Sequence, residues 1–117
     1  MLNLFAGLIT TMASIVLTTE MVELALPEGT SREVAEAYLT SMGVDSIWRP
    51  RDPADAAIAD FPWTEDDIGV LDSGIIRNVR SKWWMPSFGK VMIIHIGISV
   101  DGKVTELDFQ EFLSGWP

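Results

Sequence analysis

Two apolar segments flank the dipeptide Asp101-Gly102 near the end of the sequence. Residues 90–100 are rich in β-branched side chains, and apolar and polar residues alternate over much of residues 104–113. Asp-Gly between two such segments is a strong signal of a β-hairpin with a tight turn. The sequence therefore predicts two antiparallel strands that are joined at residues 101 and 102.

A two-residue turn at this position sets the register of the hairpin. One face becomes largely apolar, pairing Ile98 with Thr105, Ile96 with Leu107 and Ile94 with Phe109. On the other face, His95 lies opposite Asp108 and Gly97 lies opposite Glu106. A slip of one residue would bring these carboxylates against isoleucines, so the pattern favours the two-residue turn. We expect the apolar face to point to the core and the His95 face to be solvated.

A helix is predicted from Ser31 to Met42, before the hairpin in the sequence. Residues 30–33 match a capping box, with Thr30 as the N-cap, and Gly43 is placed to end the helix. We expect its apolar stripe to pack on the hairpin; the stripe consists of Val34, Tyr38 and Met42 with Ala35 and Leu39 beside them.

The remaining segments give weaker signals. Residues 75–84 predict a third strand, and residues 44–48 a short one. Residues 49–62 contain three prolines and predict an irregular excursion with a helical turn near residues 54–59. Residues 64–67 resemble a second helix N-terminus with acids in its first turn. The expected fold class is α+β, with one or two helices packed on one face of a three- to four-stranded antiparallel sheet.

An apolar N-terminal segment precedes this domain. Residues 1–19 carry no charge, which divides the chain into that segment and a single α+β domain over residues 20–117. The segment is a signal or anchor, which implies membrane contact through residues 2–19, or else a core helix. The first interpretation places the protein in the cell envelope, periplasmic or membrane-anchored, and the second in the cytoplasm.

Composition excludes several chemistries. The chain has no cysteine and one histidine, so neither a disulfide framework nor a typical zinc site can form. Its net charge of −9 disfavours nucleic acid as a partner. A catalytic pair of His95 and Asp108 is the enzymatic interpretation, but no nucleophile elbow accompanies it. We therefore expect no catalytic residues, no metal and no cofactor, and we interpret the acids at residues 65–67 as a solvated cap.

One basic and aromatic strip interrupts the acidic chain. Residues 73–100 contain no acid. On a strand, Arg80, Lys82 and Trp84 project to one side while Trp83 points to the other. Trp and Arg often anchor protein interfaces, so we predict an exposed partner-binding surface. Its candidate residues are Arg80, Lys82, Trp84, Phe88 and Lys90. The alternative is that the strip faces acidic parts of the same fold.

The chain resembles small bacterial envelope proteins in the order of its motifs. The resemblance rests on a segment from Pro27 to Gly43, followed by a late strand meander with the Asp101-Gly102 hairpin; the matching residues in that segment are Pro27, Gly29, Thr30, Ser31, Val34, Tyr38, Leu39 and Gly43. This layout is similar to the SmpA/OmlA outer-membrane-assembly lipoproteins and to the related β-lactamase-inhibitor-protein fold. The resemblance implies helices on one face of a three-stranded antiparallel sheet and a binding or scaffold role. The chain lacks the lipid-bearing cysteine of the lipoproteins.

The expected function is that of a non-enzymatic envelope or secreted domain that binds another protein. The first alternative is an acidic cytoplasmic inhibitor or immunity-type protein. The second is a small enzyme that uses His95 with Asp108.

Overall fold

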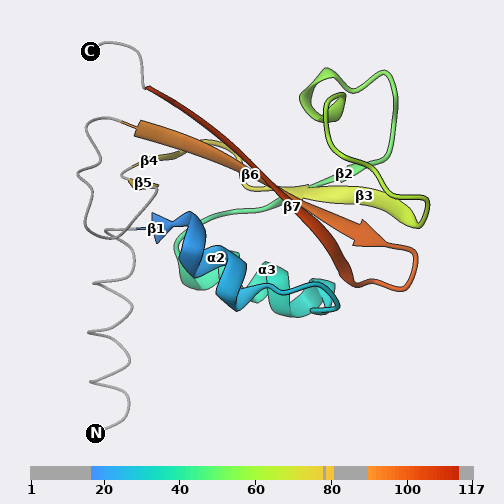
Figure 1. The fold of residues 1–117 in the computed structure, drawn as a ribbon, viewed down its shortest axis with the longest axis horizontal. Coiled ribbons are helices and arrows are strands. Elements are labelled where there is room, and N and C mark those ends of the chain that lie inside the picture. The colour runs from blue at the N-terminus through green and yellow to red at the C-terminus, as the bar shows by residue number, and fades with distance from the viewer. Residues whose placement is uncertain (1–16, 78, 81–89, 114–117) are drawn as a thin grey trace, which may run out of the picture.

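A computed structural model describes residues 17–77, 79–80 and 90–113 of the 117-residue chain. Within these residues the fold is α+β, as predicted, with helices α2 (Thr19–Ala25) and α3 (Arg32–Ser41) beside an antiparallel sheet (Figure 1). The sheet contains β2 (Ile47–Pro50), β3 (Asp67–Asp72), β4 (Ile76–Arg77), β6 (Lys90–Ser99) and β7 (Val104–Leu113). A short parallel pair joins β1 (Leu17–Thr18) to β5 (Val79–Arg80).

The long strand β6 is the centre of the sheet. Along one edge, β6 pairs with β4 near its first residues and with β3 over its last residues. Along the other edge, β6 pairs with β7 over nearly its whole length. β2 then pairs with the far side of β3. Among the described strands, the sheet therefore ends at β2 and β4 on one side and at β7 on the other.

The two strands of the predicted hairpin are confirmed, and the register holds over most of their length. Ile94 lies opposite Phe109, His95 opposite Asp108 and Ile96 opposite Leu107. The predicted two-residue turn is wrong, because Ile98 faces Val104 instead of Thr105.

The connection closes through a longer loop. Gly102, at φ +73°, donates its N–H to the Ser99 carbonyl, as in a type I turn that is followed by a left-handed glycine. A bulge between Ile96 and Ile98 then restores the predicted pairing. A Cβ at Gly97, inside this bulge, would lie 2.7 Å from the Thr105 hydroxyl and 2.8 Å from the Phe61 ring.

Helix α3 forms where it was predicted, with two corrections. Its N-cap is Ser31, whose hydroxyl accepts the Val34 N–H, whereas the Thr30 hydroxyl donates to the Pro27 carbonyl. Val34, predicted to pack in the core, is 53% exposed, because the helix turns its Ala35 and Leu39 face to the sheet. Gly43 lies just beyond the helix at φ +79°, which suits a glycine.

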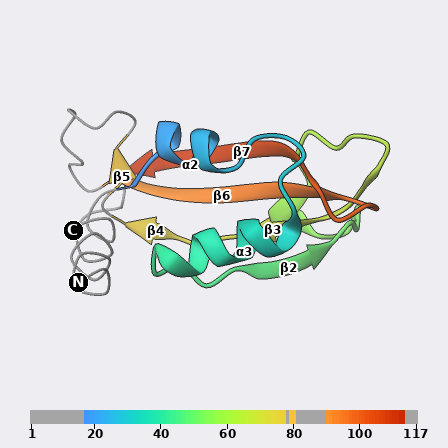
Figure 2. The same ribbon diagram turned by 90° about the horizontal axis from the view of Figure 1, so that it is seen from below.

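The two helices cover one face of the sheet (Figure 2). The main core lies between these helices and the sheet, where the isoleucines of β6 meet α2 and α3. Leu107 and Phe109 are partly buried against this core, which includes Val22, Leu26, Ala35, Leu39, Ile94, Ile96 and Ile98. Part of the other face, over β3 and the neighbouring part of β6, is covered by the irregular segment 51–63, which contains the 3-10 turn Ala56–Ile58 (Figure 1). Ile58 and Phe61 of this segment pack on Val70 in a second, smaller core.

Several elements differ from the sequence predictions. Residues 64–67 form a turn into β3 rather than a helix, and the predicted strand over residues 75–84 is divided between β4 and β5 in its described part. Helix α2 and strand β3 were not predicted. Thr18, from the uncharged run, is buried, and its hydroxyl accepts the Met21 N–H at the start of α2. Among the described residues, no helix has the length and apolar character needed to cross a membrane.

Candidate functional site

The partner-binding strip that the sequence predicts falls outside what the structure describes. Lys82, Trp84 and Phe88 lie outside the described residues. Arg80 ends β5 and Lys90 begins β6, and for both residues the structure describes the backbone but not the side chain. The candidate sites below come from other residues.

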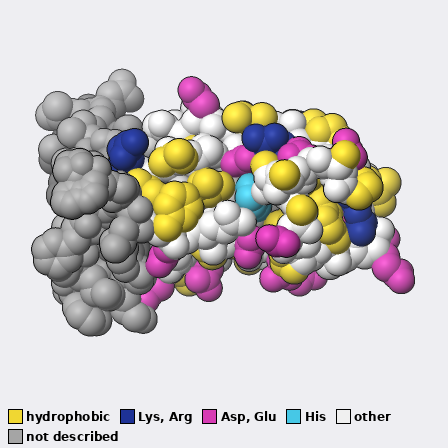
Figure 3. All heavy atoms as spheres, turned by 90° about the horizontal axis from the view of Figure 1, so that it is seen from above, with side chains coloured by type: hydrophobic (Ala, Val, Ile, Leu, Met, Phe, Trp, Pro, Cys, Tyr) yellow, Lys and Arg dark blue, Asp and Glu magenta, His cyan; other side chains and the backbone are white. Residues whose placement is uncertain are grey.

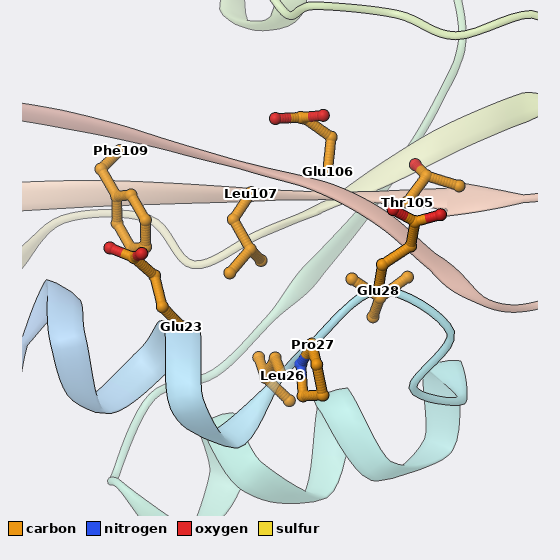
Figure 4. A pocket seen from close by; sticks show the side chains of 9 residues that line it. Glu23, Leu26, Pro27, Glu28, Thr105, Glu106, Leu107 and Phe109 are labelled. Carbon is orange, nitrogen blue, oxygen red and sulfur yellow. The ribbon is translucent and has the colours of Figure 1, made fainter.

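The first candidate is a groove of about 450 Å³ between α2 and the edge strand β7 (Figure 4). In Figure 4, Leu107 and Phe109 of β7 point toward the helix, and Leu26 and Pro27 lie across from them. The groove is lined by Glu23, Leu26, Pro27, Glu28, Val104, Thr105, Glu106, Leu107 and Phe109. An apolar floor therefore runs directly beside the edge of the sheet.

The backbone of β7 is open along this edge. Ile94 directs its backbone groups toward β3, since its carbonyl accepts the Ser73 N–H and its N–H donates to the Ser73 hydroxyl. In an antiparallel ladder, the N–H and C=O of one residue point to the same side of its strand. Where two residues face each other without exchanging hydrogen bonds, the N–H and C=O of both point away from the partner strand. Phe109, opposite Ile94, and Leu107, two residues earlier, therefore point their N–H and C=O away from β6. Within the described part of the chain, no strand pairs with this edge.

The first residue of β7 already has backbone partners on this outer edge. The Val104 N–H donates to the Thr30 carbonyl at 2.7 Å, and the Val104 carbonyl accepts the Gly29 N–H at 2.8 Å. Residues 29–32 thus pair with the start of β7 through an isolated antiparallel bridge between Ser31 and Lys103. Beyond the bulge, the regular ladder over residues 107–113 has no partner on this edge among the described residues, so an extended segment can pair with it.

Carboxylates surround the open edge. Glu23 projects from α2 toward Phe109, and Glu28 projects toward the beginning of β7 (Figure 4). Glu106 points away from the helices, on the other side of the strand (Figure 4). The residues that line the groove include three glutamates and neither lysine nor arginine. The groove is therefore apolar at its floor and acidic at its rim.

The second candidate is a charged cluster on the opposite face, where Figure 3 shows the histidine among hydrophobic and acidic side chains. The Asp72 carboxylate accepts the Arg49 Nε–H at 2.6 Å and the Gly74 N–H at 2.8 Å. Nε2 of His95 lies 3.5 Å from Asp72 Oδ2. The second Arg49 partner is Asp55, at 3.4 Å. This cluster ties together β2, β3, β6 and the irregular segment 51–63.

Burial and the neighbouring polar groups have opposite effects on the pKa of Asp72. Burial of this side chain, which is 7% exposed, raises its pKa. The hydrogen bond from Gly74, the hydrogen bond from Arg49 and the charges of His95 and Arg49 outweigh burial, so that the net pKa of Asp72 is lowered. The same ion pair raises the pKa of Arg49. Asp72 is thus held as an anion and acts as the centre of the cluster.

His95 does not lie on a solvated face, contrary to the sequence prediction. It is 2% exposed, because segment 51–63 covers this side of the sheet, and the Phe61 ring stands edge-on to it at 6.5 Å. Asp108 lies opposite it in the ladder as predicted, but the ionic neighbour of the imidazole is Asp72. Its Nδ1 is buried without a hydrogen-bond partner. His95, Arg49 and Asp72 also line a cavity of about 340 Å³.

The acidic residues near the start of β3 have structural partners. Asp67, which the sequence grouped with Glu65 and Asp66, is buried; it accepts the Thr64 N–H and the Thr105 hydroxyl. In the part of the chain that the structure describes, no group of three His, Asp or Glu side chains is arranged to hold a metal ion.

The sequence singled out His95 of the second site, but neither its ionic neighbour Asp72 nor the groove. The groove combines residues from α2, the following turn and β7, and only the sheet order reveals that β7 is an edge. Leu107 and Phe109 were correctly assigned to one face of the hairpin, which is the signal that the sequence does contain. No protein-family model matches the chain, and neither a curated protein nor a solved structure matches it.

Proposed function

We propose that this chain is a non-enzymatic protein-binding domain that takes an extended segment of its partner as an additional strand on β7. The observation that carries the proposal is the outward direction of the Leu107 and Phe109 backbone groups beside the groove along α2. Main-chain hydrogen bonds supply affinity in this mode of recognition, and pockets for alternate side chains supply specificity. The groove floor provides such a pocket for one side of the added strand.

A matched pair of variants tests this proposal. Random peptides displayed on phage are selected against the full chain, and their binding to Phe109→Pro and Phe109→Ala is compared. Both variants lose the ring, but only proline lacks the outward N–H. Neither change removes a ladder bond to β6, so both are expected to fold, and thermal unfolding of each verifies this.

Selected peptides should bind the alanine variant at least tenfold more tightly than the proline variant. The Leu107→Pro and Leu107→Ala pair repeats the comparison at the other outward residue. The proposal is overturned if no peptide is enriched, or if the enriched peptides bind the proline and alanine variants equally well.

The buried histidine is the observation that favours a second candidate, a small enzyme. A carboxylate that orients one imidazole nitrogen and leaves the other free is the usual arrangement of a general base. Nδ1 of His95 is buried, however, and a substrate cannot reach it in this conformation. Modification by diethyl pyrocarbonate distinguishes the two functions, because we expect the folded chain to react slowly. Reaction at the rate of a free imidazole would favour the enzyme.

We further propose that the domain acts in the cell envelope, with the uncharged run over residues 2–19 as its signal or anchor. The support is the length and apolar character of that run. Cell fractionation tests this location: recovery in the membrane or periplasmic fraction supports it, and recovery in the cytoplasm supports the inhibitor alternative.

A further inference from the structure

We infer that the segment recognised by β7 is basic, with lysine or arginine alternating with apolar residues. This inference rests on the proposed function and adds the chemistry of the partner. It starts from the charges on both sides of the open edge. Glu23 and Glu28 stand on the helix side, and Glu106 points to the other side (Figure 4).

The carboxylates around the edge are not used by the fold. None of Glu23, Glu28, Glu106 and Asp108 forms an ion pair within the described residues. The acids that do pair, Asp55 and Asp72, bind Arg49 on the far face, and Glu36 binds Arg32 on α3. Among the described residues, the negative charge at this edge is therefore not compensated by ion pairs, and such charge attracts a cationic segment and repels an anionic one.

The geometry of a strand assigns positions to the two kinds of side chain. Successive residues of an added strand point to opposite faces of the sheet. Residues on the helix side would lie beside Leu107 and Phe109 over the apolar floor, and residues on the other side would lie beside Glu106 and Asp108. Apolar residues fit the first set and basic residues the second. Residues 105–109 offer a length of about 17 Å, which is about five residues of extended chain.

A second copy of this chain is a poorer occupant of the same edge. In an antiparallel self-pairing centred on Leu107, Glu106 of each copy would lie opposite Asp108 of the other. Like charges directly opposite each other destabilise a strand pair, and inward or edge charges are a common defence against edge-to-edge association. The charges that favour a basic partner therefore disfavour a dimer through β7.

Three synthetic peptides test the inference with the full chain. Each is blocked at both ends, has about nine residues and alternates valine with a second residue, which is lysine, threonine or glutamate. We expect the valine–lysine peptide to bind at least tenfold more tightly than the threonine form at low salt, and the glutamate form to bind most weakly. The affinity of the lysine peptide should fall as salt is added, because exposed charges are screened.

Matched charge variants locate the effect. Neutralisation of the strand face that meets the basic residues, in a Glu106→Gln, Asp108→Asn variant, should weaken the lysine peptide by about fivefold, the summed effect of two exposed ion pairs. The control variant Glu65→Gln, Asp66→Asn changes the net charge equally at exposed positions outside the groove, and it should bind as the parent does.

The outcomes separate this inference from the proposed function. Equal binding of the lysine and threonine peptides, with both sensitive to Phe109→Pro, would overturn the basic partner and leave strand addition intact. Equal weakening by the Glu106→Gln, Asp108→Asn variant and by the control variant would also overturn it, since only the net charge would then matter. Insensitivity of all binding to Phe109→Pro relative to Phe109→Ala would overturn strand addition itself. A dimer in sedimentation that Phe109→Pro abolishes would identify a second copy as the occupant and refute the basic partner.

Discussion

Asp72 connects the buried face of the sheet to the segment that covers it, and its replacement by asparagine is the most informative change to the fold. The variant keeps the shape of the side chain but removes the charge that Arg49 and His95 face. Its amide can still accept the Gly74 N–H, so the change isolates the interaction with Arg49 at 2.6 Å. The amide NH₂ would then point at groups that are themselves donors.

The expected loss of stability depends on how deeply the Asp72–Arg49 ion pair is buried. Removal of one partner of a fully buried ion pair costs about 3–5 kcal/mol. The Asp72 side chain is 7% exposed but that of Arg49 is 30% exposed, so water screens part of the interaction. We therefore expect Asp72→Asn to lower the free energy of unfolding by about 2 kcal/mol at pH 7. The matched control is Asp55→Asn, whose contact with Arg49 is longer, at 3.4 Å, and which should lose less than about 0.5 kcal/mol.

The pH dependence provides a second measurement on the same variant. Because the pKa of Asp72 is lower in the folded state than its unfolded value of about 3.9, its contribution to stability is complete above that value. The contribution disappears as the pH falls through the folded-state pKa, where the parent carboxyl also becomes neutral. Urea unfolding at pH 7 and at decreasing pH should show the difference between parent and Asp72→Asn shrinking toward zero. A loss below about 0.5 kcal/mol at pH 7, or a difference independent of pH, would refute this account of the cluster.

Three further changes test individual elements by urea unfolding. Gly69→Ala would place a Cβ 2.6 Å from the Arg49 carbonyl oxygen, so we expect a loss of about 2 kcal/mol or more; a loss below about 0.5 kcal/mol would show that β2 and β3 are not this close. Ser31→Ala removes the N-cap of α3 and should cost about 1 kcal/mol, whereas no loss would contradict the assigned cap. Leu39→Ala should cost about 2–5 kcal/mol, and Val34→Ala, on the exposed side, less than about 0.5 kcal/mol; equal losses would contradict the orientation of the helix.

Elements with strong local signals were predicted from the sequence with small errors. The hairpin strands and the helix at residues 32–41 rest on alternation, capping residues and terminal glycines, all of which act within a few residues. Their errors arise at contacts between distant segments. Gly97 makes room for the Phe61 ring and the Thr105 hydroxyl, and this packing accompanies a bulge that a pairing rule based on the turn alone does not contain.

Elements defined by distant partners were missed. The strand β3 has six residues with a glycine in its interior, and only its place between β2 and β6 explains its burial. Helix α2 has seven residues and begins inside the end of the uncharged run, which concealed its N-cap at Thr18. His95 was assigned to a solvated face because apolar and polar residues alternate along the hairpin. The residues that bury it belong to segment 51–63, whose position over the sheet is not encoded in local sequence patterns.

Amide hydrogen exchange at β7 reports directly on the addition of a strand to this edge. In the free chain, the outward amides of Leu107 and Phe109 should exchange quickly, whereas the inward amide of Asp108 is protected by its bond to β6. Saturation with the valine–lysine peptide should slow exchange at Leu107 and Phe109 by at least tenfold and leave Asp108 as a nearly unchanged reference. Unchanged exchange at Leu107 and Phe109 in the presence of bound peptide would contradict the addition of a strand at this edge.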